Sequence, residues 1–383
     1  MKLVRTFHPV GHGAFYTERF YDDHNVCKFT AVYDCGGGPV GGIKKYITNY
    51  VRDDSNLNEN GRIDILFVSH FHSDHIEGIP HLLDYCDKIA FPVLTPNIML
   101  EAVVHNAITQ KESNKGEDVN DILYDIYDKK GIYDEKRMMF VDEAEEKRQL
   151  LDEDSSREIE YAGGVIKSGI KFTSNKVPNW IFYPYNLKKG EIKQKIKDYF
   201  KANGVITENN TIDTENLKIV LRRSLKEVQK IYKETEDEKT NFHSMTVYSG
   251  HKDCHRHLYC ECCCVCKIAN CDKCNNLDAN PHCLYMGDFP ANVQNVSELK
   301  RYYKEYWRCR GTIQVPHHGS NEVDGVYDDN LFYHCKIGIF SMKFRRYNGI
   351  PSSFVIKELI NSDAIPVYVT DDIKTKVTKI YSI

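Results

Sequence analysis

The sequence predicts a mixed α/β fold in which short strands and helices alternate along two halves of the chain. Three apolar runs, at residues 63–68, 284–287 and 313–315, have the length and composition of buried strands. Within two residues of its end, each run is followed by an aspartate or histidine side chain. Two charged stretches, residues 97–160 and 188–240, have helical character and interrupt the pattern. We therefore expect one sheet-based domain with helical insertions and a polar cluster where strands end.

The elements follow one another as a single domain, residues 1–383, with a third insertion at residues 251–283 that is rich in cysteine and histidine. The expected helices lie near residues 43–52, 75–86, 294–305 and 352–361. The expected strands lie near residues 2–8, 12–20, 28–34, 63–68, 88–94, 163–173, 180–183, 244–249, 283–287, 311–316, 335–341 and 366–370.

Four metal-binding side chains fall within six residues at the end of the run at 63–68. They are His70, His72, Asp74 and His75, in the pattern H-x-H-x-D-H. Imidazole and carboxylate ligands together suit zinc, manganese or iron. Two ions held about 3.5–4 Å apart activate a water and stabilise an attacked phosphoryl or carbonyl group. The spacing therefore predicts a two-metal hydrolytic centre rather than a surface loop rich in histidine.

Two later strand ends supply further candidate ligands. Asp288 directly follows the run at 284–287, and its two carboxylate oxygens are able to bridge two ions. His317 and His318 follow the run at 313–315, where one histidine would complete the second site. Neither a Gly-Asp nor a His-His pair is informative alone, but their order after the first motif predicts one shared centre.

These motifs belong to a longer series of matching segments: residues 9–13 (PVGHG), 32–38 (VYDCGGG), 70–75 (HFHSDH), 241–244 (NFHS), 286–288 (MGD), 316–320 (PHHGS), 337–341 (IGIFS), 348–352 (NGIPS) and 367–370 (VYVT). In this series the chain resembles the metallo-β-lactamase-fold hydrolases. Within them it is most similar to the hydrolase domain of ComEC-type competence channels and its free-standing soluble relatives. The resemblance spans nearly the whole chain and implies a four-layer αββα sandwich with two divalent ions, Zn or Mn.

The resemblance also implies a role for each candidate side chain. His70 and His72 resemble ligands of the first metal. Asp74 and His75 resemble ligands of the second metal, and Asp288 resembles the bridging carboxylate. The family's Pro-Gly-His-Gly form points to His318 as the last ligand, whereas the strand geometry also permits His317. The histidine that does not bind metal, or Asp74, would orient substrate or transfer a proton.

Other residues are expected to support this centre. Asp34 resembles a carboxylate that orients a metal-bound histidine. Ser320 and Lys343 are candidate substrate contacts, because Lys343 belongs to a basic group that follows a strand near the metal edge. Most two-metal relatives carry a further histidine before the bridging aspartate. The candidates here are His105, which reads as part of a helix, and His243, which belongs to the segment 241–244.

Nine of the fourteen cysteines fall within residues 254–283, between two expected strands. They include two C-x-x-C pairs, 263–266 and 271–274, whose spacing suits one or two tetrahedral zinc ions. Structural zinc is the interpretation we favour over disulfides or an iron–sulfur or redox centre. Such a finger would also offer a docking surface for a protein partner. The structural-zinc candidates are Cys254, Cys260, Cys263, Cys266, Cys271, Cys274, Cys283, His257 and His282.

Composition agrees with a soluble bacterial enzyme. The 383 residues are 41% hydrophobic, with a net charge of −4, so no global basic surface indicates nucleic-acid binding. Neither a long apolar run nor a secretory leader is recognisable, so we expect a cytoplasmic protein with no membrane contact.

The resemblance to ComEC domains implies nuclease chemistry. We therefore expect a metal-dependent phosphodiesterase or nuclease that acts on DNA, RNA or nucleotides. Two alternatives stay open: a hydrolase of esters, thioesters or lactones, since the same metals serve carbonyl chemistry, and a partner-binding component of a defence or DNA-uptake system. A substrate panel separates the first alternative, and metal content at the histidine motif separates the second.

Overall fold

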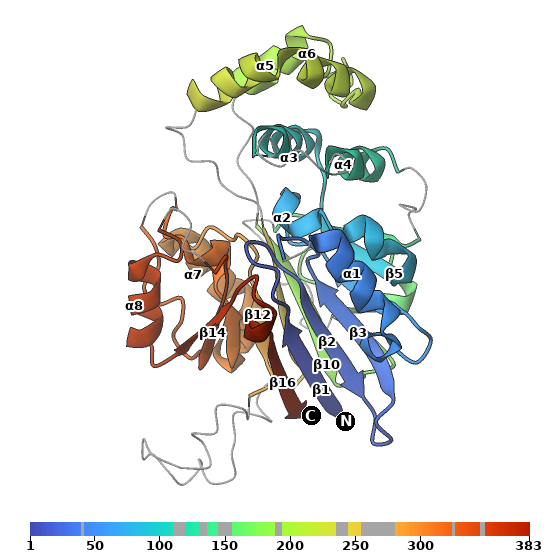
Figure 1. The fold of residues 1–383 in the computed structure, drawn as a ribbon, viewed down its shortest axis with the longest axis vertical. Helices are drawn as coiled ribbons and strands as arrows, with labels where there is room; N and C mark the ends of the chain where they lie inside the picture. Colours follow the sequence, from blue (N-terminus) through green and yellow to red (C-terminus); the bar gives the residue numbers. More distant parts are fainter. Residues whose placement is uncertain are drawn as a thin grey trace.

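The computed structural model describes residues 1–39, 42–109, 119–129, 136–144, 155–187, 194–234, 244–253, 280–323, 326–344 and 349–383. These residues form two eight-stranded sheets that pack face to face, with helices on both outer faces (Figure 1). The predicted α+β sandwich is confirmed by this arrangement.

The first sheet has the order β16-β1-β2-β3-β4-β5-β6-β8. It is antiparallel from β16 to β3 and parallel from β3 to β8. Its strands are β1 (Lys2–Phe7), β2 (Tyr16–Tyr21), β3 (Cys27–Tyr33), β4 (Ile63–Phe67), β5 (Cys86–Pro92), β6 (Met138–Val141), β8 (Gly164–Ile166) and β16 (Val377–Ser382).

The second sheet has the order β15-β14-β13-β12-β11-β10-β9-β7, and β12 to β15 run parallel. Its strands are β7 (Ser156–Glu158), β9 (Lys171–Thr173), β10 (Trp180–Asn186), β11 (Met245–His251), β12 (Cys283–Tyr285), β13 (Thr312–Gln314), β14 (Ile337–Ser341) and β15 (Ile365–Val369).

Aromatic side chains fill the space between the sheets. Phe20 lies edge-on to Trp180 with ring centroids 5.4 Å apart, and Phe29 stacks on Phe182 at 5.7 Å. Because successive side chains of a strand point to opposite faces, neighbouring residues of β4 serve different layers. Phe67 joins this inner core, and Leu66 packs in the outer core under the helices. Covering both faces explains why every residue of β4 is buried.

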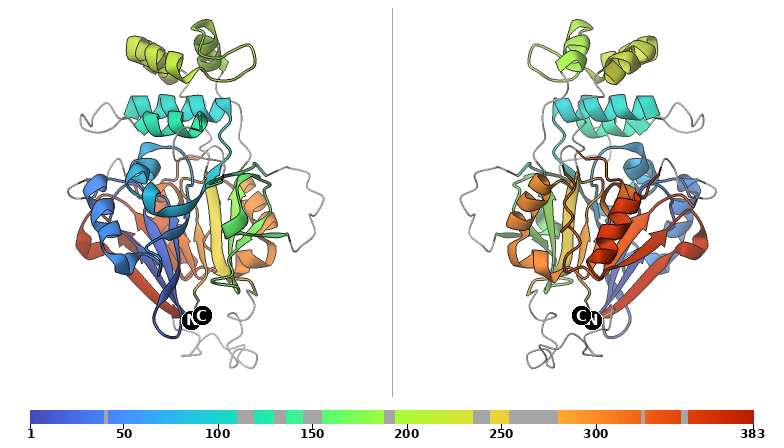
Figure 2. Two further views of the ribbon diagram at one scale, coloured as in Figure 1. Left: turned by 90° about the vertical axis from the view of Figure 1, so that its right-hand side faces the viewer. Right: turned by 90° about the vertical axis from the view of Figure 1, so that its left-hand side faces the viewer.

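The helices form two outer layers and a cap. Figure 2 shows α3 and α4 stacked above α2, with α5 and α6 outermost. Helix α1 covers the first sheet, and α7 and α8 cover the second. The helices are α1 (Ile43–Arg52), α2 (Ser73–Ile76), α3 (Pro96–Thr109), α4 (Val119–Tyr127), α5 (Gln194–Ala202), α6 (Thr214–Glu234), α7 (Val293–Tyr303) and α8 (Ser353–Asn361).

The structure differs from the sequence-based expectations in three places. The stretch 97–160 is not wholly helical, since β6 and β7 lie within it and continue the two sheets. The helix expected at 75–86 is a four-residue helix followed by 3₁₀ turns, with Pro80 beginning a new turn. Strand β16 was not expected, because its alternating half-buried pattern is that of an edge strand. Among the described residues, none of the helices has both the length and the apolar character that a bilayer crossing requires.

Candidate metal centre

The metal motif lies where β4 ends, at the edge of the sandwich beneath α3 (Figure 1). His70 directly follows the buried residues Val68 and Ser69, and His72 precedes the first turn of α2. The side chains of His70, His72 and His75 are all buried. Asp74 lies in that same turn and is partly open to solvent. The contiguous motif thus folds into a tight loop with its imidazoles turned inward.

Asp34, at the end of the neighbouring strand β3, holds this loop in place. Its carboxylate accepts hydrogen bonds from the Ser69 backbone N–H at 2.6 Å and the Ser69 hydroxyl at 2.8 Å. It also lies 2.8 Å from Nδ1 of His75. A proton on that nitrogen leaves Nε2 of His75 as a lone-pair donor directed into the centre. Asp34 is fully buried and has a left-handed backbone, with φ of 58°, a conformation that is costly for a non-glycine residue.

Parallel strand ends of the second sheet face this loop. Asp288 follows β12, and its backbone N–H donates to the Ser244 hydroxyl at 2.9 Å. His317 and His318 follow β13, and both have left-handed backbones with φ of 50° and 54°. The His317 backbone N–H donates to the Gly287 carbonyl at 2.9 Å, which ties the two strand ends together.

The side chains gather into two groups, each with ligand atoms within 4.8 Å of one another. The first group is His70, His72 and Asp288, and the second is Asp74, His75 and His318. The structure therefore brings the distant strand ends to the motif.

Asp288 lies between the two groups. Its Oδ2 is 3.6 Å from Nε2 of His70, and its Oδ1 is 3.4 Å from Nε2 of His75 and 3.8 Å from Nε2 of His318. These separations are long for hydrogen bonds, but they match the distance between two ligand atoms that bind the same metal ion. Each Asp288 oxygen thus faces a different group, as a bridging carboxylate would.

The donor set fits divalent metal ions. Four buried atoms at the centre make no hydrogen bond within the described residues: Nε2 of His70, His75 and His318, and Oδ1 of Asp288. Buried polar atoms in native proteins almost always have partners, so four together point to a missing ligand. Nitrogen and carboxylate donors in this mixture suit Zn²⁺ or Mn²⁺.

Electrostatics favour the ligand forms of the first-group histidines. Burial, and then the charge on His75, lowers the pKa of His70 to about 3. Burial and the neighbouring His105 lower the pKa of His72 well below its usual value. Both imidazoles are therefore neutral near neutral pH, as metal binding requires.

In the second group, the charges of the ionisable side chains affect one another's pKa values more strongly. Burial alone would lower the pKa of His75, but the carboxylates of Asp74 and Asp288 outweigh it and raise that pKa well above its usual value. Burial would raise the pKa of Asp74, but the charges of His75 and His318 lower it instead. A bound cation would replace the positive charge that His75 otherwise supplies to these carboxylates.

His317 and His318, which are adjacent in the turn after β13, point toward different groups of the centre. Nδ1 of His318 donates to the Ser341 carbonyl at 3.0 Å, so its Nε2 points into the second group, 3.3 Å from Asp74. Nε2 of His317 lies 3.9 Å from Oδ2 of Asp288, on the side of the first group. The structure therefore places His318 in the second group of candidate ligands and His317 at the more exposed rim.

The two candidate substrate contacts lie in different surroundings. Ser320 is buried, and its hydroxyl accepts the Glu322 backbone N–H at 3.1 Å, so it caps the turn after His318. Lys343 is exposed, and it approaches Gly11 beside the metal centre closely enough that a Cβ there would lie 3.7 Å from its Cγ.

Two further histidines, His12 and the weak candidate His105, lie against the candidate ligands. His12 packs on His318 with ring centroids 4.4 Å apart, and burial and His318 lower the pKa of His12 to about 4. His105 of α3 stacks on His72 at 3.8 Å, with the two rings 11° from parallel. His12 belongs to the matching segment 9–13 but was given no role, and His105 was a candidate for the further histidine; the structure stacks it on His72.

The structural-zinc candidates fall partly outside and partly inside the described residues. Cys254, Cys260, Cys263, Cys266, Cys271, Cys274 and His257 lie outside the described residues, as does His243. His282 is buried and donates from Nδ1 to the Cys309 carbonyl at 3.0 Å. Cys283 lies in β12 within the core between the sheets, where burial raises the pKa of its thiol to about 12. Cys283 is therefore a core thiol, and the cysteines expected to share a zinc ion with it lie outside the described residues.

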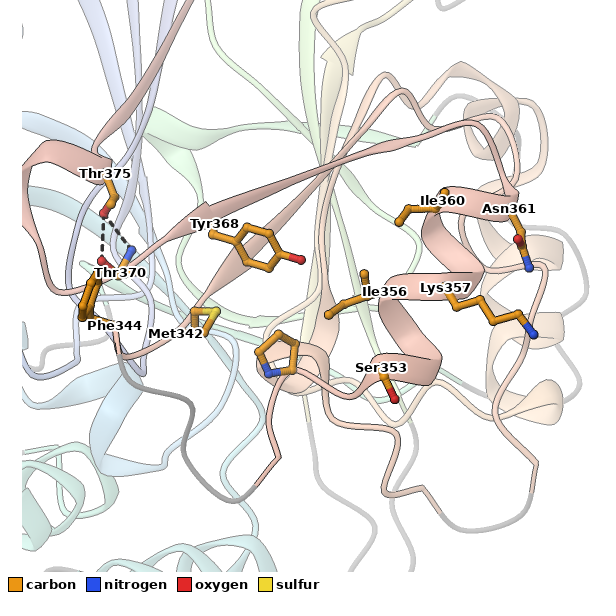
Figure 3. Close-up of a pocket in the computed structure, with 11 residues that line it drawn as sticks. Met342, Phe344, Ser353, Ile356, Lys357, Ile360, Asn361, Tyr368, Thr370 and Thr375 are labelled. Atoms are coloured by element: carbon orange, nitrogen blue, oxygen red, sulfur yellow. Dashed lines mark hydrogen bonds between the residues drawn. The ribbon is translucent and has the colours of Figure 1, made fainter.

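A hollow of about 800 Å³ adjoins the turn that carries His318. Figure 3 shows its lining, with Tyr368 of β15 and Ile356 of α8 on opposite sides. Pro351, which also lines it, packs so closely on Gly319 that a Cβ on that glycine would lie 2.7 Å away. The hollow is thus largely apolar, and through Pro351 it adjoins the turn that follows His318.

Comparison with known proteins adds little to this geometry. No family model matches the chain, and no curated protein matches its sequence. The crystal structure of unliganded yeast PDE1 is similar over 99% of each chain, with 8% sequence identity and a TM-score of 0.39. So low a score supports no conclusion, and the function must be inferred from the side chains of this chain.

Proposed function

We propose that this chain is a metal-dependent hydrolase of the metallo-β-lactamase fold, related to ComEC-type hydrolase domains, which cleaves phosphodiesters in DNA, RNA or nucleotides. The observation that carries the proposal is the convergence of four unpartnered buried donor atoms from three strand ends. Two divalent ions, when bound, would lower the pKa of water to near neutrality and neutralise charge on a phosphoryl group.

The chain's own residues set the geometry for that reaction. The His70 group and the Asp74 group would each hold one ion, with Asp288 shared between them. Asp34 and the Ser341 carbonyl keep Nδ1 of His75 and His318 protonated, so the opposite nitrogens stay free to bind metal. At the rim, His317 is placed to contact a substrate oxygen.

Two features outside the ligand set favour a phosphodiester substrate. Lys343 offers a positive charge beside Gly11 and His12, where a phosphate oxygen would extend from the centre. The apolar hollow beside the Pro316–Gly319 turn leaves room for a substrate larger than its reacting group.

The first experiment replaces ligands of both groups. His72→Ala and Asp288→Ala should lower metal-dependent hydrolysis of bis-p-nitrophenyl phosphate by at least about 10³-fold, because each removes a metal ligand. Activity and metal content are measured together, with circular dichroism as the check of folding. A panel of nucleic acids, lactones and thioesters separates phosphoryl from carbonyl substrates.

His24→Ala is the matched control, because His24 is exposed in the β2–β3 turn, outside the metal centre. It should retain wild-type activity and metal content. Wild-type rates in both ligand variants would refute the proposal.

A further inference from the structure

The two groups of the centre are supported by different parts of the molecule. In the second group, His75 is oriented by Asp34 and His318 by the Ser341 carbonyl, and both supports come from sheet strands. In the first group, the residues around His72 contact α3, which lies outside both sheets.

Asn106 of α3 joins the backbone on both sides of His72. Its Oδ1 accepts the Ser73 backbone N–H at 3.0 Å, and its Nδ2 donates to the Phe71 carbonyl at 3.1 Å. Asn106 is fully buried, as is its bond to Phe71, and its bond to Ser73 is partly buried. A primary amide that satisfies a donor and an acceptor two residues apart fixes the intervening residue in one conformation.

His105, the preceding residue of α3, covers the ring of His72. The parallel stack at 3.8 Å limits rotation of the His72 imidazole about its side-chain bonds. His70 packs edge-on to that imidazole, with ring centroids 4.6 Å apart. Backbone and ring of His72 are thus both held, the backbone by Asn106 and the ring by its two neighbours.

Helix α3 is itself firmly anchored. Its residues Leu100, Val103 and Val104 are fully buried in the core beneath the cap. Asn120 of α4 donates to the Val103 carbonyl at 3.3 Å, three residues before Asn106. The helix therefore has a rigid base from which Asn106 and His105 reach the loop.

We propose that α3 positions the first metal site: Asn106 and His105 are positioning residues for His72, so occupancy of the first site depends on this helix and occupancy of the second does not. The inference rests on the proposed metal centre and deepens it. It also gives the helical insertion after β5 a role in metal binding.

The test is metal titration of the full chain with Mn²⁺, which hard carboxylate and imidazole ligands bind and thiolates bind poorly, so the cysteine-rich segment contributes little. Wild-type protein should bind two ions. His72→Ala and His75→Ala, each expected to weaken one step, identify which step belongs to which site.

Asn106→Ala should weaken the step assigned to His72 by 10–100-fold, typical for loss of an outer support, and leave the His75 step unchanged. Asn120→Ala is the matched control, since it removes another buried asparagine whose amide donates to α3 itself. Thermal melts report any general loss of stability in both variants.

Two substitutions test whether the flat ring of His105 is what supports His72. His105→Ala should weaken the same step, and His105→Phe should restore it, because a flat ring alone provides the stack. Wild-type affinity for both ions in folded Asn106→Ala, or equal weakening in Asn120→Ala, would overturn the inference. A wild-type chain that binds neither Mn²⁺ nor Zn²⁺ here would instead remove the proposed function itself.

Discussion

Two buried carboxylates in this molecule, Glu18 and Asp288, have opposite surroundings. Glu18 lies between the sheets, where its Oε1 accepts from Nε of Arg5 at 2.7 Å and from the Tyr285 hydroxyl at 2.8 Å. Its Oε2 accepts from the Ser249 hydroxyl at 2.6 Å. Asp288 at the strand ends faces four imidazole nitrogens, each at 3.4 Å or more, and its Oδ1 accepts no hydrogen bond within the described residues.

The difference separates a structural polar cluster from a ligand site. Each oxygen of the Glu18 carboxylate meets a donor at hydrogen-bond distance, so this carboxylate is satisfied without any added group. In the Asp288 cluster the donor atoms face one another across gaps of the size that a cation fills. Both carboxylates are buried, and the hydrogen bonding of their oxygens distinguishes them.

The largest expected effect on stability comes from breaking the buried ion pair between Glu18 and Arg5. Glu18→Gln leaves Arg5 buried without its counter-charge, 2.6 Å from the altered group, and should lower the free energy of unfolding by about 3–5 kcal/mol. Urea unfolding measures this change. Added Mn²⁺ should still raise the melting temperature of the variant, whereas Asp288→Ala should lose that increase. Loss of the increase in Glu18→Gln would show that the two clusters are not independent.

A smaller effect on stability is expected at Gly36, whose backbone packs against that of Asp74 and His75. A Cβ on Gly36 would lie 2.3 Å from the Asp74 carbonyl oxygen and 2.5 Å from the His75 nitrogen. Gly36→Ala should therefore cost about 1–3 kcal/mol of stability and displace these two ligands. Gly38→Ala, in the same loop, meets nothing within 4 Å and should be nearly neutral. Equal stability and metal affinity in the two variants would contradict the packing argument.

The dependence of stability on pH provides a third test, at a histidine that is not a candidate ligand. Burial, and then the charges of Lys376 and Arg19, lowers the pKa of His8 well below its usual value. Below about pH 6.5 the unfolded chain therefore binds a proton that the folded chain does not. The free energy of unfolding should fall with acidification by up to about 1.4 kcal/mol per pH unit from this group.

Urea unfolding of metal-free protein between pH 7.5 and 5 measures this slope. His8→Gln should make it shallower by up to one proton, and parallel slopes in the two proteins would exclude the effect.

The smallest effect is expected at the rim. Lys343→Ala should raise KM for a phosphodiester by about five-fold, roughly 1 kcal/mol, with little change in kcat, because an exposed lysine adds modest binding energy. Lys336→Ala, an exposed lysine at the start of β14, is the control. Steady-state kinetics with bis-p-nitrophenyl phosphate distinguishes the two, and an unchanged KM would place substrate away from Lys343.

Much of the centre was recognisable from local order along the chain. His70 to His75 are contiguous and follow an apolar strand, so strand geometry alone brings them to a sheet edge. Asp288 and His318 required the assumption that separate strands end at the same edge. The break in the helix expected after His75 and the edge strand β16 were missed, because Gly78 and Pro80 redirect the chain and β16 is only half buried.

The amino-acid sequence by itself determined the kinds of donor atom, their grouping at strand ends and the mixed α/β class, because these follow from short-range pattern and side-chain chemistry. Only the tertiary structure decided that Asp34 orients His75, that His318 and not His317 points into the second group, and that α3 closes on His72. Those contacts join residues far apart in the chain or on separate elements, and their geometry depends on how sheets and helices pack together.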